Sequence, residues 1–275
     1  MSYQAQTFAI VGLGRSSGKT TVIQALIKEL KARGYAIATI KHIHSRFDVA
    51  EKDTELHAKA GAVSVTAVSP RELAIMRYDI PPNLENALKT VSPKASFILI
   101  EGFSHSALPK ILCLSKSGSE ALEATKKMEG IGGSIMAIVD IFRNPNLSGS
   151  LAGIPVFRLY EIPKLADLLE THALEALKQS LPGLNCGQCG FGDCQGMAKA
   201  ILRKEVPISQ CKPLSHQETI LEIYGESIPM VPFVQRLLKN TILGLVSSLK
   251  GSGRIEGTDP SKLRVKVKIE ALEEN

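Results

Sequence analysis

A glycine- and serine-rich segment near the start of the chain contains the residue types that hold phosphate groups. It follows an apolar run and leads into an amphipathic one, an order that predicts a strand, a phosphate-binding loop (P-loop) and a helix beginning at Lys19. Backbone N–H groups of the loop and the positive end of the helix dipole would converge on a phosphate. Lys19 would add a point charge, and the Thr20 hydroxyl would bind a Mg²⁺ ion that bridges the outer phosphates. The expected phosphate-binding residues are Gly14, Arg15, Ser16, Ser17, Gly18, Lys19, Thr20 and Thr21.

The segment departs from the strict P-loop pattern at one position. That pattern has a glycine five residues before Gly18, whereas this chain has Leu13 there, flanked by Gly12 and Gly14. The alternative is an ordinary turn ahead of a helix, which would leave Lys19 without a role. The position between a strand and a helix favours the P-loop.

A carboxylate follows a second apolar run. Residues 97–100 are Phe-Ile-Leu-Ile, and Glu101 and Gly102 come next. This pattern predicts a buried parallel strand with an acid at its carboxyl end, where the Walker B acid of a P-loop protein lies near magnesium. A glutamate that only meets solvent at a strand end is the alternative. Lys19 and Glu101 are the expected catalytic residues of any slow nucleotide hydrolysis.

Basic and histidine residues follow the strand expected at 36–40. They are Lys41, His42 and His44, and Asp48 lies slightly further on. In open α/β sheets the ligand crevice lies outside the carboxyl ends of the strands, so this run is a candidate binding face. His42 and His44 would point to one side of an extended segment and could share a ligand such as phosphate or pterin oxygens. Hydrogen-bonded structural roles are the alternative.

Four of the five cysteines form a cluster in a glycine-rich segment, with the spacing C-x2-C-x4-C-x16-C. They are Cys186, Cys189, Cys194 and Cys211. Three thiolates in a loop and a fourth after a short helix at 195–204 can surround an iron–sulfur cluster, and glycines let backbone amides approach its sulfurs. A structural Zn²⁺ ion also takes four thiolates, but zinc ribbons usually pair two short knuckles, and this chain has a single C-x2-C. The spacing favours the iron–sulfur cluster, whereas Cys113, alone in an apolar run, is expected to be a small buried side chain.

Apolar periodicity predicts the elements that position these groups. Helices are expected at 19–30, 51–60, 84–90 and 162–179, and strands at 36–40, 62–68, 73–76, 96–100, 110–114, 135–139 and 156–159. The expected fold class is α/β, with a P-loop NTPase-like, mostly parallel sheet flanked by helices, followed by a small Fe–S domain and an α+β tail. The expected domains are 1–180, 181–216 and 217–275.

The tail carries no recognisable motif. A helix is expected at 233–249, with one apolar packing stripe. The stripe consists of Val234, Leu238, Ile242, Leu245 and Leu249. Apolar and charged residues alternate over 263–270, which predicts an edge strand with one buried face and lysines that guard against aggregation.

Composition limits the possible partners. The formal net charge is +6, but lysines and arginines are interspersed with acids and there is no Trp, so nucleic-acid binding is not expected. No apolar run reaches the roughly 18 residues of a membrane helix, and the N-terminus does not resemble a signal peptide. We therefore expect a cytoplasmic protein without a membrane span.

Residues 6–172 resemble the MobB family, molybdopterin-guanine dinucleotide biosynthesis protein B. The matching motifs are SSGKTT, LKARGY, ATIKHIHSRFDV and ILIEGFSH. The resemblance implies a GTP-binding protein, usually a homodimer, that assists the attachment of GMP to molybdopterin or passes on the finished cofactor. It implies phosphate binding by Gly14–Thr21, Mg²⁺ binding by Thr20 and Glu101, and an adjoining face lined by Lys41, His42, His44 and Asp48. The preference for GTP comes from the resemblance alone, because the N-K-x-D motif of ordinary GTPases is absent.

Residues 182–214 resemble the small four-cysteine domain of the B subunit of Rnf electron-transport complexes and of corrinoid iron–sulfur subunits. The motif that carries the resemblance is CGQCGFGDC, followed by AKAI and a distant Cys-Lys-Pro. This resemblance implies a [4Fe-4S] cluster on all four cysteines. MobB family members usually end near residue 172, so the Fe–S segment and the tail are additions.

These patterns lead to one expected function and two alternatives. We expect a GTP-binding accessory protein of molybdenum or tungsten cofactor biosynthesis, with a molybdopterin guanylyltransferase or a client metalloenzyme as partner. The first alternative is an electron-transfer or reductive-activation module, in which nucleotide binding gates electron delivery to a corrinoid or other metalloprotein. The second is a redox-sensing scaffold without turnover.

Overall fold

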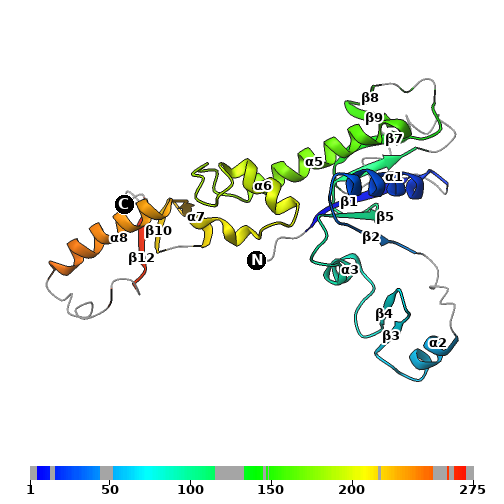
Figure 1. The fold of residues 1–275 in the computed structure, drawn as a ribbon, viewed down its shortest axis with the longest axis horizontal. Coiled ribbons are helices and arrows are strands. Elements are labelled where there is room, and N and C mark those ends of the chain that lie inside the picture. The colour runs from blue at the N-terminus through cyan, green and yellow to red at the C-terminus, as the bar shows by residue number, and fades with distance from the viewer. Residues whose placement is uncertain are drawn as a thin grey trace, which may run out of the picture. The chain divides into compact units, whose positions relative to one another are not determined.

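A computed structural model describes residues 5–12, 16–43, 52–114, 133–144, 147, 149–215, 218–249, 259 and 263–270. The chain divides into two compact units, Ala5–Asp167 and Leu168–Asn275 (Figure 1). In the described part of the chain, no helix is long and apolar enough to cross a membrane.

The first unit is built on a seven-stranded sheet with the order β2-β5-β1-β6-β7-β9-β8. Its strands are β1 (Gln6–Gly12), β2 (Ile37–Lys41), β5 (Phe97–Glu101), β6 (Lys110–Cys113), β7 (Ile135–Asp140), β8 (Ser150–Leu151) and β9 (Ile154–Arg158). All pairs are parallel except β8 with β9. Residues 97–100 are all buried, as expected of a strand covered on both faces. The predicted α/β fold with a mostly parallel sheet is therefore confirmed.

The strand order brings distant residues to one edge of the sheet. Strand β5 lies between β1 and β2, so that Ile10 and Lys41 are the register partners of Glu101 on its two sides. Parallel strands end at the same edge, and the carboxyl ends of β1, β5, β6 and β7 therefore meet there. One detail of the prediction is wrong: Lys41 is the last residue of β2 and does not follow the strand.

Helix α1 (Lys19–Ala32) begins at the predicted residue. It buries Val22, Ile23, Leu26 and Leu30, which recur at helical spacing on one side. Helices α3 (Leu84–Thr90) and α5 (Ile162–Gln179) also have the predicted bounds, and a 3₁₀ turn, η1 (Leu159–Glu161), leads into α5. The main helical elements thus follow directly from apolar periodicity.

The segment between β2 and α3 forms a small structure outside the main sheet. Helix α2 (Lys52–Lys59) precedes β3 (Ser64–Val68) and β4 (Leu73–Arg77), which pair only with each other, as an antiparallel two-stranded sheet. Both strands were predicted, but apolar patterning does not say which sheet a strand joins.

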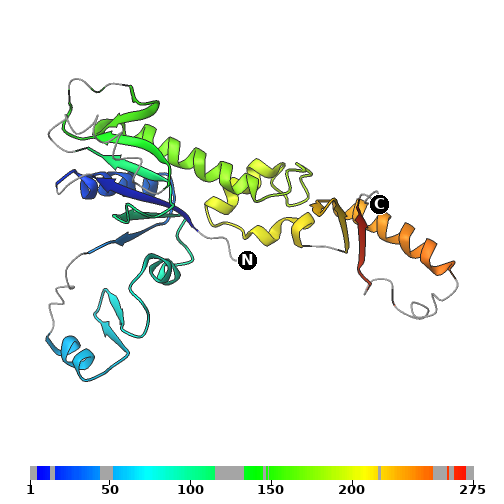
Figure 2. The same cartoon turned by 180° about the vertical axis from the view of Figure 1, so that it is seen from behind.

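The second unit contains the cysteine segment and the tail. Its elements are α6 (Cys194–Leu202), η2 (Ile208–Gln210), α7 (Lys212–Ser215), β10 (Thr219–Ile223), β11 (Glu226–Ile228), α8 (Pro232–Ser247) and β12 (Val265–Ile269). The three strands form a sheet with the order β11-β10-β12, and α8 packs against β10 (Figure 2). Strand β12 lies at an edge, as predicted, but its expected buried face is only half-buried, and Ile269 is exposed.

The packing stripe predicted for α8 is wrong at three of its five positions, whereas Leu238 and Ile242 are half-buried. Val234, Leu245 and Leu249 are exposed, whereas Gln235 and Lys239 are only 2% and 3% exposed. The Gln235 amide accepts a hydrogen bond from the Glu218 N–H at 3.0 Å and donates one to the Met230 carbonyl at 2.8 Å. Lys239 pairs with Glu218. Backbone groups that need partners thus bring the polar side of this helix inward.

Candidate functional site

Glycines at two positions give the P-loop its shape. A Cβ atom at Gly12 would lie 2.0 Å from Ser17 Oγ, so this glycine leaves space for the buried Ser17 side chain. Gly18 is the N-cap of α1 and has a φ of 82°, and a Cβ there would lie 2.2 Å from Ile141 Cδ1. The close packing of Gly12 shows why a glycine is needed next to Leu13, the position at which the strict motif is broken.

The described P-loop residues are Ser16, Ser17, Gly18, Lys19, Thr20 and Thr21. Lys19 Nζ donates to Ser17 Oγ at 3.1 Å, so the ammonium group lies over the loop at the start of α1. The N-terminus of α1 offers backbone N–H groups beside this charge, an arrangement that suits a phosphate. Gly14, Arg15, His44 and Asp48, which the sequence predicts as binding residues, lie outside the described residues.

Thr20 and Glu101 meet directly. Thr20 Oγ1 donates to Glu101 Oε2 at 3.1 Å, and Lys41 Nζ lies 3.5 Å from Glu101 Oε1. In an octahedral Mg²⁺ site with Mg–O distances of about 2.0–2.1 Å, neighbouring oxygens lie about 2.9 Å apart. The spacing of these two oxygens therefore fits two adjacent ligands of one Mg²⁺ ion.

Cys113 lies beneath this group at the end of β6 and is fully buried, as predicted. Burial raises the pKa of its thiol to about 12; the charge of Lys19 opposes this rise, and that of Glu101 adds to it. The thiol therefore stays protonated at neutral pH and is not a nucleophile.

His42 is held beside Glu101 by two contacts. Its backbone N–H donates to the Glu101 carbonyl at 2.9 Å, and its ring stacks on Phe103 with centroids 4.4 Å apart. Gly102 has a φ of 102°, and a Cβ there would lie 2.9 Å from His42 Cβ. Phe103 was not predicted as a site residue, and only its place directly after Glu101-Gly102 could have indicated it.

A buried ion pair shapes the loop that follows β7. Asp140 is fully buried and accepts hydrogen bonds from Phe142 N at 2.9 Å and Asn144 N at 2.7 Å. Its carboxylate also pairs with Arg158, which donates to the Asn144 carbonyl as well. This network sets the backbone of the loop from which Ile141 reaches Gly18, and no sequence motif indicated it.

The four clustered cysteines are free thiols in the second unit, three of them half-buried and Cys211 buried. Burial raises the pKa of Cys211, and the other three cysteines raise it further, so the four thiols lie within electrostatic range of one another. Gly187, Gly190 and Gly192 all have positive φ, and a Cβ at Gly187 would lie 3.0 Å from the Gly192 carbonyl oxygen. A compact glycine loop thus holds the first three cysteines.

Four thiolates are a donor set that both a [4Fe-4S] cubane and a structural zinc ion take. In the part of the chain that the structure describes, no three thiol, imidazole or carboxylate groups converge as the ligands of a single metal ion do.

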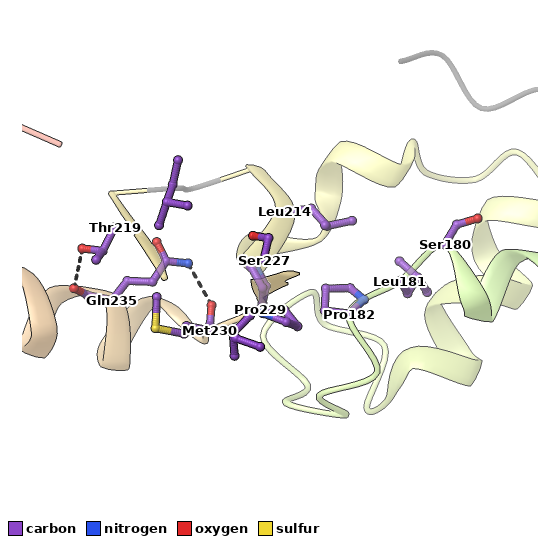
Figure 3. A pocket seen from close by; sticks show the side chains of 12 residues that line it. Ser180, Leu181, Pro182, Leu214, Thr219, Ser227, Pro229, Met230 and Gln235 are labelled. Carbon is purple, nitrogen blue, oxygen red and sulfur yellow. Dashed lines mark hydrogen bonds between the residues drawn. The ribbon is translucent and has the colours of Figure 1, made fainter. Parts of the chain in front are cut away.

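The second unit also contains a cavity of about 260 Å³, shown in Figure 3. Its walls include Pro182, Pro213, Leu214, Thr219, Met230 and Gln235, and none of the described residues that line it is charged or a cysteine. Thr219 Oγ1 donates to the Gln235 carbonyl at 2.8 Å, so polar groups in the wall bond to each other. The cavity therefore suits neither a phosphate nor the cluster.

Two family models match the chain. The model described as "MobB: Molybdopterin guanine dinucleotide synthesis protein B" matches residues 7–140, and the one described as "Putative Fe-S cluster" matches residues 181–213. The first match includes the P-loop and Glu101, and the second includes all four clustered cysteines.

Individual proteins match over different lengths. A Methanocaldococcus jannaschii protein, "Putative molybdopterin-guanine dinucleotide biosynthesis adapter protein", is 26% identical over 264 residues, which is 94% of this chain and 96% of that protein. The B subunit of an ion-translocating oxidoreductase complex of Rhodobacter capsulatus is 42% identical over 40 residues, 14% of this chain and 21% of that protein. The crystal structure of Bacillus subtilis MobB covers 60% of this chain and 96% of its own, with 19% identity and a TM-score of 0.47. Residues 7–140 thus match the MobB model, and residues 181–213, further along the chain, match the Fe–S cluster model.

Proposed function

We propose that this chain is a cytoplasmic GTP-binding accessory protein of molybdenum or tungsten cofactor biosynthesis, which assists the formation or delivery of molybdopterin guanine dinucleotide. The contact between Thr20 and Glu101 beside the P-loop carries the proposal, because it joins a phosphate-binding loop to a carboxylate at the spacing of Mg²⁺ ligands. The match to a MobB model supports the choice of pathway, and the M. jannaschii relative is named as an adapter protein.

The proposed chemistry at this site is binding and charge neutralisation. Ser16 to Thr21 and the preceding loop residues Gly14 and Arg15 would hold the phosphates, with Lys19 at the outer ones. Thr20 and Glu101 would hold Mg²⁺, which proteins usually bind through one or two carboxylates plus substrate phosphates. Lys41 and His42, with His44 and Asp48, would line the side on which molybdopterin could bind. Hydrolysis would be slow, with Lys19 and Glu101 as its catalytic residues.

The proposed domains are 1–180 for nucleotide, 181–216 for the cluster and 217–275 for a tail of separate role. Cys186, Cys189, Cys194 and Cys211 would hold a [4Fe-4S] cluster, which supplies one-electron redox chemistry when bound. Three half-buried cysteines leave one side of that site near solvent, where a partner could exchange electrons.

A homodimer is part of the proposal. A two-stranded sheet alone is marginally stable in water, so β3 and β4 need a further packing partner. Large apolar side chains of this segment are exposed, among them Val68 at 78% and Ile75 at 60%. A second copy of the chain could cover this surface, and a molybdopterin guanylyltransferase would be a further partner.

Nucleotide titration of the anaerobically purified full chain tests the function. Lys19→Ala should abolish binding of Mg²⁺·GTP while the visible absorbance of the cluster is unchanged. The control, Lys28→Ala, replaces an exposed lysine on the same helix and should leave nucleotide binding intact. Survival of nucleotide binding in Lys19→Ala would show that the P-loop assignment is wrong.

The short match to the B subunit of an ion-translocating oxidoreductase complex favours a second candidate, nucleotide-gated electron delivery to a corrinoid or other metalloprotein. Mass spectrometry of molecules that copurify with the anaerobic protein separates the two. A retained pterin or guanine nucleotide supports cofactor biosynthesis. Absence of both, together with tight association with a corrinoid protein, would contradict it.

A further inference from the structure

The strand order assigns the two ends of a bound nucleotide to opposite sides of β1, provided that the proposed nucleotide binding is correct. Glu101 lies on β5 and Lys41 on β2, both on one side of β1. A Mg²⁺ ion on Thr20 and Glu101 would place the outer phosphates on that side. The nucleoside would therefore extend toward the other side, where β6 and β7 end.

The loop after β7 lies against the P-loop on this second side. Ile141 packs on Gly18, as shown by the 2.2 Å that would separate its Cδ1 from a Cβ at Gly18. Asp140 cannot itself contact a base, because its buried carboxylate is already bonded to the loop backbone and to Arg158. The residues available to a nucleoside are those that follow Ile141.

Arg143 is the residue that this loop presents. Its side chain is exposed, and it makes no hydrogen bond or ion pair with any residue that the structure describes. Its φ of 57° is unusual for a residue with a side chain, and Asp140 maintains it by bonding the N–H groups of Phe142 and Asn144 on its two sides. The Asp140–Arg158 pair thus fixes the backbone at Arg143, two residues after the Ile141 side chain that packs on Gly18.

We propose that Arg143 reads the base of the nucleotide and selects guanine. A guanidinium presents two parallel N–H donors, which match the O6 and N7 acceptors of guanine. Adenine presents an amino donor in place of O6 and would lose one of these bonds. This contact would supply guanine selection in a chain that lacks the N-K-x-D motif.

Competition titrations of the full chain with GTP, ITP and ATP in the presence of Mg²⁺ test this role. The native chain should bind GTP and ITP with equal affinity, because hypoxanthine keeps O6 and N7. Its affinity for ATP should be lower by about tenfold or more. Arg143→Gln should lower the affinity for GTP by about tenfold or more and raise the affinity for ATP, since glutamine pairs with N6 and N7 of adenine. Arg143→Lys keeps the positive charge but loses the two parallel N–H donors. It should therefore also lower the ratio of GTP affinity to ATP affinity.

The control is Arg236→Gln, which changes an exposed arginine on α8 and should leave the ratio of GTP affinity to ATP affinity unchanged. If Arg143→Gln lowers the affinities for GTP and ATP by the same factor, Arg143 contacts a phosphate and does not read the base. If the variant changes neither affinity, Arg143 does not contact the nucleotide, and the proposal is overturned as well. If the native chain binds no nucleotide, the proposed function fails, and this inference fails with it. Circular dichroism of each variant confirms that the fold is retained.

Discussion

Thr20 and Glu101 are 81 residues apart in sequence, yet Thr20 Oγ1 donates a hydrogen bond to Glu101 Oε2 at 3.1 Å. The contact exists because β5 lies next to β1, so that the carboxyl end of β5 lies beside the first turn of α1. A hydroxyl and a carboxylate at this spacing would supply part of the proposed magnesium site, and the phosphates of the nucleotide would supply further ligands.

Glu101→Gln should remove most of the Mg²⁺ dependence of nucleotide affinity. The amide keeps the size of the side chain but loses the charge that the ion needs, so affinity for Mg²⁺·GTP should fall about tenfold or more. Affinity measured in EDTA should change little. Isothermal titration with and without Mg²⁺ checks this, with Glu85→Gln, an exposed acid paired with Lys89, as control. Equal Mg²⁺ dependence in native and variant chains would exclude Glu101 as a ligand.

Arg158→Met should destabilise the first unit by about 3 kcal/mol or more, because it leaves the buried Asp140 carboxylate without its charged partner. Arg77→Met breaks an exposed pair with Asp79 and should change the stability far less, because solvent screens an exposed ion pair. Chemical denaturation compares the two variants. If adding Asp140→Asn restores none of the stability lost in Arg158→Met, the loss does not come from the unpaired charge.

Cys211→Ser should prevent assembly of a complete four-thiolate cluster. Iron and acid-labile sulfide should be about four of each per native chain and should fall sharply in the variant. Cys113→Ala is the matched control, because this buried thiol belongs to the sheet of the first unit. One zinc per native chain without labile sulfide would show that the site is a zinc site.

Val68→Asp combined with Ile75→Asp should convert the proposed homodimer to a monomer. Both side chains are exposed in the two-stranded sheet, and desolvating two carboxylates in a dimer interface would be costly. Light scattering after gel filtration gives the mass of each form. Phe233→Asp, on the exposed side of α8, controls for general effects of an added charge. A native chain that is monomeric at every concentration would contradict the proposed dimer.

Apolar periodicity was sufficient for α1 and α5 because each of them buries one continuous side. Helix α5 has the predicted bounds, and α1 begins at Lys19, where Gly18 ends the loop. It was not sufficient for α8, where the need of Glu218 and Met230 for hydrogen-bond partners outweighed apolar burial and turned Gln235 inward. Burial of a polar residue that satisfies several backbone groups has no periodic signature.

The sequence by itself determined which functional groups this protein carries: a glycine-rich loop ending at Lys19, an acid after a buried strand, and four closely spaced cysteines. Residue type and local spacing suffice for these, because each motif lies within one short segment. Only the tertiary structure decided which groups act together. Strand order placed Glu101 next to Thr20, stacked His42 on Phe103, and brought Ile141, in the loop that the Asp140–Arg158 pair fixes, against Gly18. These contacts join segments far apart in the chain, and their formation depends on which strands are neighbours, a choice that no local pattern contains.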